Sequence, residues 1–323
     1  MPLIEHSQYQ PSHFLYKNPH ISTIYVGRVK KTKPPIYKRE RLELEDGDFL
    51  DVDYHLKSPK KAVILCHGLE GNSTRTYNNT SATYFLNQNF TVFAWNNRSC
   101  SGEMNRLPRL YHHAVVEDLE KVVNWVIEQG FEEIFLLGFS MGGAQILNYL
   151  GTKEVNPKIK SGVAVSAPVQ LKSSAEILKK GFNQVYLKNL LSKISKKLKE
   201  KSEQYPELLD WDKLKNIRTF DEVDEYFTAP LHGFLDKEDY YKRASPGFVM
   251  HNIKIPVLIL NALDDPFLGK ACYPYKFAKE HSFVYLETPK HGGHCAFPQG
   301  KTIFSYSEMR AFKFFEDRET SKL

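Results

Sequence analysis

The sequence predicts a protein of the α/β class, built on a mostly parallel central sheet that is flanked by helices. Two observations lead to this prediction. Short apolar runs rich in β-branched residues recur along the chain, and each run ends at turn residues. These runs do not alternate between apolar and polar residues, which is typical of strands covered on both faces. Helix-compatible segments separate the runs, and alternating strands and helices form βαβ units around a parallel sheet.

Six apolar runs supply the expected core strands: 62–66, 90–95, 134–138, 162–166, 256–261 and 283–287. The clearest helix between them runs from His113 to Gln129, where the apolar residues share one face and Gly130 provides a stop. In open sheets of this kind the functional groups gather beyond the carboxyl ends of the strands. The residues that directly follow the six runs are therefore the candidates for a functional site.

Two regions fall outside this alternation of strands and helices. Residues 41–54 alternate between polar and apolar types around Gly47, which predicts an antiparallel hairpin at the sheet edge. Residues 169–250 have a largely helical pattern and are inserted between two core strands. An insertion there covers the carboxyl edge of the sheet, so we expect a helical lid over about 169–250. Because no Gly/Ser-rich linker divides the chain, residues 1–323 are expected to form one domain.

The composition is that of a soluble globular protein, with 41% hydrophobic and 25% charged residues in a chain of 323. No uncharged apolar run approaches the length that spans a bilayer. The first residues lack the basic segment and apolar run of a signal peptide, so a cytoplasmic location is expected. The four cysteines form no C-x-x-C pair, and neither a disulfide framework nor a zinc site is indicated.

The formal net charge of +6 is concentrated in residues 179–201, where eight lysines are accompanied by a single acidic residue, Glu200. One interpretation is a solvated helix face. The other is a surface for anionic lipid head groups or acidic substrates, which implies weak peripheral membrane contact through the lid. No nucleic-acid-binding motif accompanies the charge, so nucleic acid is not an expected partner. The oligomeric state is left open.

The segment Gly138-Phe-Ser-Met-Gly142 predicts the nucleophile of an acyl-transfer enzyme. A serine hydroxyl attacks well only when a sharp strand-to-helix turn exposes it and a base is near, and small residues two before and two after the serine allow that turn. The context fits, because a buried-type strand precedes the segment and the helix-compatible run 143–150 follows it. Ser140 is therefore the predicted nucleophile.

A base and an acid are expected from later loops. His294 follows the last core strand and a glycine pair, which makes it the favoured base, with His291 as the alternative. Asp264 and Asp265 follow the preceding strand, and one carboxylate is needed to orient the imidazole. Asp265 is favoured because side chains alternate in direction and this residue directly precedes the Pro turn. The chain order Ser, Asp, His is that of α/β-hydrolases.

An oxyanion in such a site is stabilised by backbone N–H groups. The N–H of Met141, after the nucleophile, is one expected donor, and the N–H of Leu69, after the first core strand, is the other. His67 is expected to be a structural loop residue. Cys66 and Cys295 flank histidines, but small buried hydrophobic residues are the better interpretation.

His113 and Asp118 show the H-x-x-x-x-D spacing of some glycerolipid acyltransferases. Only two of its six positions are fixed, so matches by chance are common. Asp118 also lies on the amphipathic helix, and an acyltransferase role through this pair is not expected.

Several further blocks occur in order along the chain: 13–20 with 22–24, 41–51, 67–71, 97–106, 110–112, 220–221, 228–233, 239–241, 261–267 and 291–294. With these blocks the chain resembles, nearly end to end, the YheT-like branch of the α/β-hydrolases, which is related to ABHD1/ABHD3-type esterases and lipases. At two places the sequence departs from the usual residues of this family, and these changes are expected to alter the pocket. Asn97 precedes Arg98 where many members have Phe, and Cys295-Ala296 replaces the more usual Val-Gly.

The resemblance implies an α/β-hydrolase fold, a Ser140–Asp265–His294 triad and carboxylesterase or lipase-like activity on a small acyl ester or lipid, without cofactor or metal. A thioesterase or an acyltransferase on the same triad is the alternative, and a non-catalytic binding protein on a hydrolase fold is another. The natural substrate, its acyl chain length and the position of the lid are left open.

Overall fold

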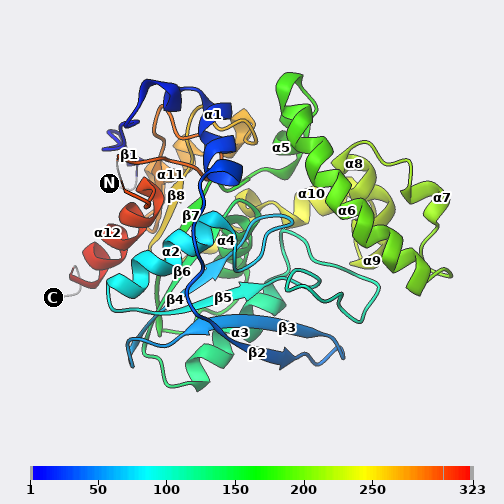
Figure 1. Cartoon of the computed structure of the whole chain (residues 1–323), viewed down its shortest axis with the longest axis horizontal. Coiled ribbons are helices and arrows are strands. Elements are labelled where there is room, and N and C mark those ends of the chain that lie inside the picture. The colour runs from blue at the N-terminus through cyan, green and yellow to red at the C-terminus, as the bar shows by residue number, and fades with distance from the viewer. Residues whose placement is uncertain (1–2, 301, 321–323) are drawn as a thin grey trace.

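The computed structural model describes residues 3–300 and 302–320. Within them, a nine-stranded sheet runs through the centre in the order β1-β9-β8-β7-β6-β4-β5-β3-β2 (Figure 1). All neighbouring pairs from β5 to β1 are parallel, whereas β3 pairs antiparallel with both β5 and β2. The strands are β1 (Leu3–Ile4), β2 (Lys38–Glu43), β3 (Phe49–His55), β4 (Lys61–Cys66), β5 (Thr91–Asn96), β6 (Glu133–Phe139), β7 (Ile159–Val165), β8 (Val257–Leu260) and β9 (Val284–Glu287).

The predicted α/β class is confirmed, and the six expected core strands correspond to β4 to β9. The expected edge hairpin is β2–β3, and its register pairs Leu42 with Leu50. The bounds of the core strands differ by one to three residues from the prediction, most at β7, which begins at Ile159. The short β1 was not predicted because two residues carry no period.

Both faces of the sheet are covered, which explains why its strands are apolar throughout. Side chains alternate along β4, so that Ile64 belongs to one hydrophobic cluster and Leu65 to the other. The helices on the first face are α3 (Val116–Glu128) and α4 (Met141–Thr152), and those on the second are α2 (Thr76–Asn87) and α12 (Tyr306–Thr320). A parallel sheet needs this double cover, because its helical crossovers lie on both faces.

The helices differ from the prediction in two places. Helix α3 begins at Val116, three residues later than expected, and ends before Gly130, which has φ +92°. Helix α2 was not predicted because its sequence is rich in Thr, Asn and Ser and has no apolar stripe. Its buried face combines the apolar side chains of Ala82 and Phe85 with polar contacts, including one from the Thr80 hydroxyl to the Glu308 carboxylate of α12.

The segment between β7 and β8 is helical in the structure and gathers to one side of the sheet (Figure 1). In the longest helix of this segment, the buried leucine and isoleucine positions recur with helical spacing at Leu187, Leu191, Ile194 and Leu198. The helices of the segment are α5 (Leu171–Leu178), α6 (Gln184–Gln204), α7 (Trp211–Leu214), α8 (Phe220–Val223), α9 (Ala229–Leu231) and α10 (Lys237–Ala244). Among the described residues, no helix is long and apolar enough to cross a bilayer.

The lysines of residues 179–201 do not form one solvated face. Lys197 makes an ion pair with Glu70 at 2.8 Å and is largely buried. Lys201 is buried and donates to the backbone carbonyls of Asn105 and Leu107. The solvated-face interpretation is therefore wrong for these two residues, and it fits only the exposed lysines, which include Lys188, Lys196 and Lys199.

Arg98, which follows β5, forms a buried ionic network. Its side chain is only 4% exposed, and its guanidinium makes a two-pronged contact with Asp118 of α3 at 2.7 and 2.8 Å. It also contacts Asp46 at 2.8 Å and Asp48 at 3.0 Å. Asp118 is thus a structural residue, in line with the expectation that the H-x-x-x-x-D spacing arose by chance.

We expect Arg98→Met to lower the free energy of unfolding by about 3–5 kcal/mol, because buried carboxylates then lose their counter-charge. Urea unfolding followed by circular dichroism measures this loss. The matched control is Arg243→Met on α10, which breaks an exposed pair with Asp239 and is expected to cost less than about 1 kcal/mol. Equal losses in the two variants would contradict a structural role for the buried network.

Candidate active site

Ser140 lies at the tight turn between β6 and α4. Its backbone has φ +53° and ψ −119°, a region that costs a side-chain-bearing residue about 1–3 kcal/mol. The chain passes so close to itself that a Cβ on Gly142 would lie 2.2 Å from the Cys66 carbonyl oxygen, and one on Gly138 would lie 2.4 Å from the Gly142 carbonyl oxygen. Both glycines of the motif are therefore required by the turn that exposes the serine.

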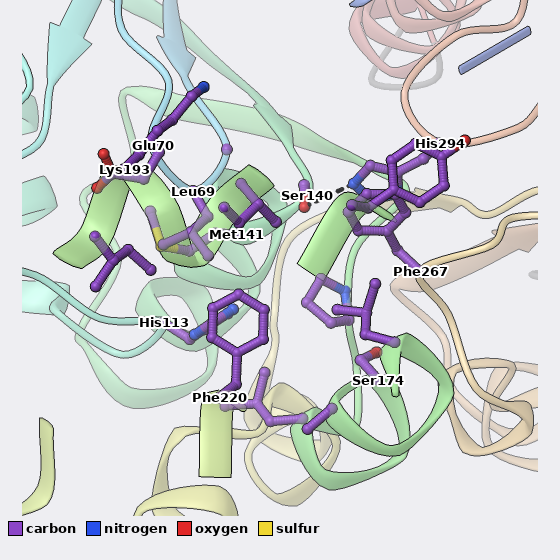
Figure 2. A pocket seen from close by; sticks show the side chains of 18 of the residues that line it. Leu69, Glu70, His113, Ser140, Met141, Ser174, Lys193, Phe220, Phe267 and His294 are labelled. Carbon is purple, nitrogen blue, oxygen red and sulfur yellow. Dashed lines mark hydrogen bonds between the residues drawn. The ribbon is translucent and has the colours of Figure 1, made fainter. Parts of the chain in front are cut away.

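The structure brings the favoured serine, histidine and aspartate together. The Ser140 Oγ lies 2.9 Å from His294 Nε2, the contact dashed in Figure 2. On the other side of the ring, His294 Nδ1 lies 2.9 and 3.0 Å from the two carboxylate oxygens of Asp265. These residues follow β6, β9 and β8, whose carboxyl ends meet at one edge of the sheet.

The two alternative residues form a separate pair. Asp264 accepts a hydrogen bond from the Gly293 N–H at 2.9 Å and lies 3.3 Å from His291 Nδ1. Asp265, in contrast, is buried, contacts His294 and accepts a hydrogen bond from the Phe267 N–H at 2.9 Å. Asp264 is therefore a loop-capping residue, and its partner His291 braces the same loop.

Three contacts that sequence reasoning missed hold the His294 loop. The His294 N–H donates to the Thr23 hydroxyl of α1 (Pro19–Ile24) at 2.9 Å, and the Cys295 N–H donates to the Ser166 hydroxyl at 2.9 Å. The Phe267 ring stacks on the imidazole, with centroids 3.9 Å apart and planes 10° apart. A signal for Thr23 and Phe267 existed, because both lie in blocks that carry the family resemblance.

Two opposing effects act on the pKa of His294. Burial lowers it, while the charge of Asp265 and its hydrogen bond raise it, and the net shift is above the ordinary value. A carboxylate at Nδ1 also keeps a proton on that nitrogen, which leaves the Nε2 lone pair directed at the Ser140 hydroxyl. This arrangement can accept the serine proton and stabilise the resulting imidazolium.

The backbone N–H groups of the loop after β4 differ in their hydrogen-bond partners. The N–H groups of Gly68 and Glu70 donate to the hydroxyls of Tyr77 and Tyr111, each at 3.0 Å. The N–H of Leu69, between them, makes no hydrogen bond to any residue within the described part of the chain. Leu69 and Met141 line the same cavity as the serine, and Figure 2 shows their side chains beside Ser140.

His67 is buried and structural, as expected. Its Nδ1 lies 2.7 Å from the Gly68 carbonyl, its Nε2 accepts from the Asn97 N–H at 3.0 Å, and burial lowers its pKa to about 4. Asn97 itself contacts His67 and Gln145 and is not among the described residues found to line the cavity, and the effect of this departure on the pocket stays a prediction. Cys295 does line it, and all four cysteines are free and buried.

A cavity of about 740 Å³ opens at Ser140 and His294. On one side it is apolar and bounded by Leu110 and by residues of the segment between β7 and β8: Leu171, Leu178, Phe220, Val223 and Phe227. Another side carries charged groups, among them Glu70 and Lys193, which Figure 2 shows away from His294. Among the described residues, no group of three or more His, Cys, Asp or Glu side chains is placed to hold a metal ion.

The nine-stranded sheet and the serine turn define the class of α/β-hydrolases. The family model described as the alpha/beta hydrolase fold matches residues 61–301, so the chain belongs to the α/β-hydrolase family. It is 31% identical over 272 residues to YheT of Escherichia coli (strain K12), a protein provisionally described as an esterase, covering 82% of this chain and 79% of YheT. The predicted YheT-like resemblance is confirmed.

Other relatives include the mouse (Mus musculus) phospholipase ABHD3, which is 30% identical over 281 residues, covering 83% of this chain and 68% of the phospholipase. Among solved structures, the esterase Pf2001 of Pyrococcus furiosus superposes with a TM-score of 0.58 at 17% identity, covering 89% of this chain and 98% of that chain. The chain is thus an α/β-hydrolase with relatives of the esterase and lipase type.

Proposed function

We propose that this protein is a serine hydrolase that cleaves carboxylic esters through an acyl-enzyme on Ser140. The observation that carries the proposal is the hydrogen-bonded chain from Ser140 through His294 to Asp265, in which Ser140 and His294 line a cavity with an apolar side. Such a chain activates a hydroxyl, and the apolar side suits the acyl part of an ester.

In the first step, His294 Nε2 takes the serine proton as Ser140 Oγ bonds to the ester carbonyl carbon. The carbonyl oxygen becomes an oxyanion, and the Leu69 and Met141 N–H groups are the donors proposed to stabilise it. The C–O bond to the alcohol then breaks, and His294 returns the proton to the leaving alkoxide.

In the second step, water replaces the alcohol. His294 takes a proton from the water, whose oxygen bonds to the acyl carbon, and the Ser140–acyl bond breaks with return of that proton to Ser140. Asp265 holds the imidazole at Nδ1 in both steps and stabilises the imidazolium. The products are the carboxylic acid and the free alcohol.

We also propose that residues of about 169–250 form a lid within a single domain. Support comes from the cavity wall, since α5, α6 and α8 contribute Leu171, Leu178, Ile194, Phe220 and Val223 to it. A cover of this kind limits the access of bulk solvent to the site and sets the length of acyl chain that fits. Hydrolysis of p-nitrophenyl esters from acetate to palmitate, by purified protein, tests the proposed function and gives the preferred chain length; no turnover of any of them would contradict it.

The pH profile is expected to report His294. Neutral imidazole is needed as the base, so kcat/KM should fall as pH drops through the pKa of His294. Because Asp265 raises that pKa, the acid limb of the wild-type profile should lie above the ordinary value of about 6.5. In Asp265→Asn the limb should move to lower pH, and an unmoved limb would contradict the pairing. Measuring kcat/KM over pH 5–10 gives the acid limb of the wild type and that of Asp265→Asn.

A further inference from the structure

Three cations surround the charged side of the cavity. Arg28 lies in the helical turn η2 (Tyr25–Val29), Arg75 directly precedes α2, and Lys193 lies in α6. All three line the same cavity as Ser140. Throughout the described part of the chain, no carboxylate lies within the 4.0 Å of an ion pair to any of these three side chains.

Neutral acceptors hold two of these cations in place. Arg28 donates to the side-chain oxygen of Asn189 at 2.6 Å, and Arg75 donates to the backbone carbonyl of Glu70 at 2.7 Å. These bonds fix the guanidinium groups without neutralising them. Helix α2 begins beside them with no side-chain cap, so the positive end of its dipole adds to the same potential.

The carboxyl groups in the cavity wall do not balance this charge. Glu70 is already engaged by Lys197 at 2.8 Å and by the Tyr111 hydroxyl at 2.6 Å. Asp224 accepts a hydrogen bond from Thr228 within the proposed lid, and burial raises its pKa to about 7. The charged side therefore keeps an excess of positive charge.

The cations are also close enough to repel one another. Burial lowers the pKa of Lys193, and the charges of Arg75, Arg28 and Lys197 lower it further while Glu70 opposes them. A bound anion would relieve this repulsion. Two guanidinium groups and an ammonium, which come from three separate elements and line one cavity, suit an anion with several outward oxygens, as a phosphate has.

We propose that Arg28, Arg75 and Lys193 form a subsite for a phosphate carried by the alcohol half of the ester substrate. The apolar side of the cavity takes the acyl chain, so the charged side takes the leaving alcohol. This assignment rests on the proposed function and names its substrate class: an acyl ester of a phosphate-bearing alcohol. Because the three cations line the same cavity as Ser140, the proposed occupant is a single ester molecule, and the test separates it from a lipid surface.

The test compares two esters with the same acyl chain, 1-octanoylglycerol and 1-octanoylglycerol 3-phosphate, both as monomers in solution. The wild type should prefer the phosphate ester by kcat/KM, and the preference should shrink as salt rises. Lys193→Gln and, separately, Arg75→Gln should each lower the ratio of the two kcat/KM values about 10-fold to 100-fold. The matched control, Lys196→Gln, changes an exposed lysine of the same helix and should leave the ratio unchanged.

A binding measurement separates failure of the subsite from failure of the proposed function. In a Ser140→Ala background, calorimetry should show that 1-octanoylglycerol 3-phosphate binds, and that Lys193→Gln or Arg75→Gln weakens binding about 10-fold to 100-fold. Equal binding in all variants, or an unchanged ratio of rates, overturns the subsite. A preference seen only when the phosphate ester is embedded in vesicles, and lost equally in Lys196→Gln, overturns it in favour of a membrane surface.

Discussion

Replacing Ser140 with alanine is expected to lower kcat for p-nitrophenyl octanoate by on the order of 10⁴-fold or more. The hydroxyl supplies the attacking oxygen and lies 2.9 Å from His294 Nε2. Steady-state kinetics measure the loss of kcat, and the rate of ester hydrolysis without active enzyme is subtracted as a blank. Thermal unfolding should stay close to wild type, since alanine and serine carry the same Cβ at φ +53°.

The matched control for this variant is Ser192→Ala, which changes an exposed serine of α6 and should keep wild-type kinetics. Labelling with a fluorophosphonate gives an independent readout, with the wild type labelled and Ser140→Ala unlabelled. A Ser140→Ala protein that is folded and keeps most of its activity would exclude the proposed nucleophile.

The second large effect is expected at Asp265. Asp265→Asn should lower kcat by roughly 10³–10⁴-fold, because an amide favours the wrong imidazole tautomer and does not stabilise the imidazolium. Asp264→Asn should lower it by less than about tenfold, since an amide oxygen can still accept from the Gly293 N–H. The two substitutions lie at neighbouring positions, and each replaces one carboxylate oxygen by an amide nitrogen. Each variant is therefore the control for the other. Comparable losses in both would contradict the assignment of Asp265 as the partner of His294.

The core sheet could be predicted because its signals are local. Each buried strand is a continuous apolar run, and the serine turn needs its two glycines within five residues. The choice of Asp265 over Asp264 also followed from a local rule, the alternation of side chains before a turn. In the structure Asp265 contacts His294, whereas Asp264 accepts from the Gly293 N–H, and the catalytic role of Asp265 stays a prediction.

The remaining features depend on contacts between residues far apart in the chain. Thr23 supports His294 across 271 positions, and Arg98 meets Asp46 from a separate loop. Helix α2 buries polar residues such as Thr80 beside Ala82 and Phe85, and this mixed face produces no apolar stripe. The lysines of α6 are identical in type but differ in burial. The burial of each lysine depends on what packs against its turn of the helix, and the sequence of the helix does not show this.

The central claim is that an ester transfers its acyl group to Ser140, and trapping that intermediate tests it most directly. Wild-type protein mixed with excess p-nitrophenyl octanoate is quenched in acid after one turnover, digested and mapped by mass spectrometry. An octanoyl group on the peptide that contains Ser140, absent from the Ser140→Ala protein, is the predicted result. An octanoyl group found on another residue, such as Cys295, with Ser140 unmodified, would contradict the account.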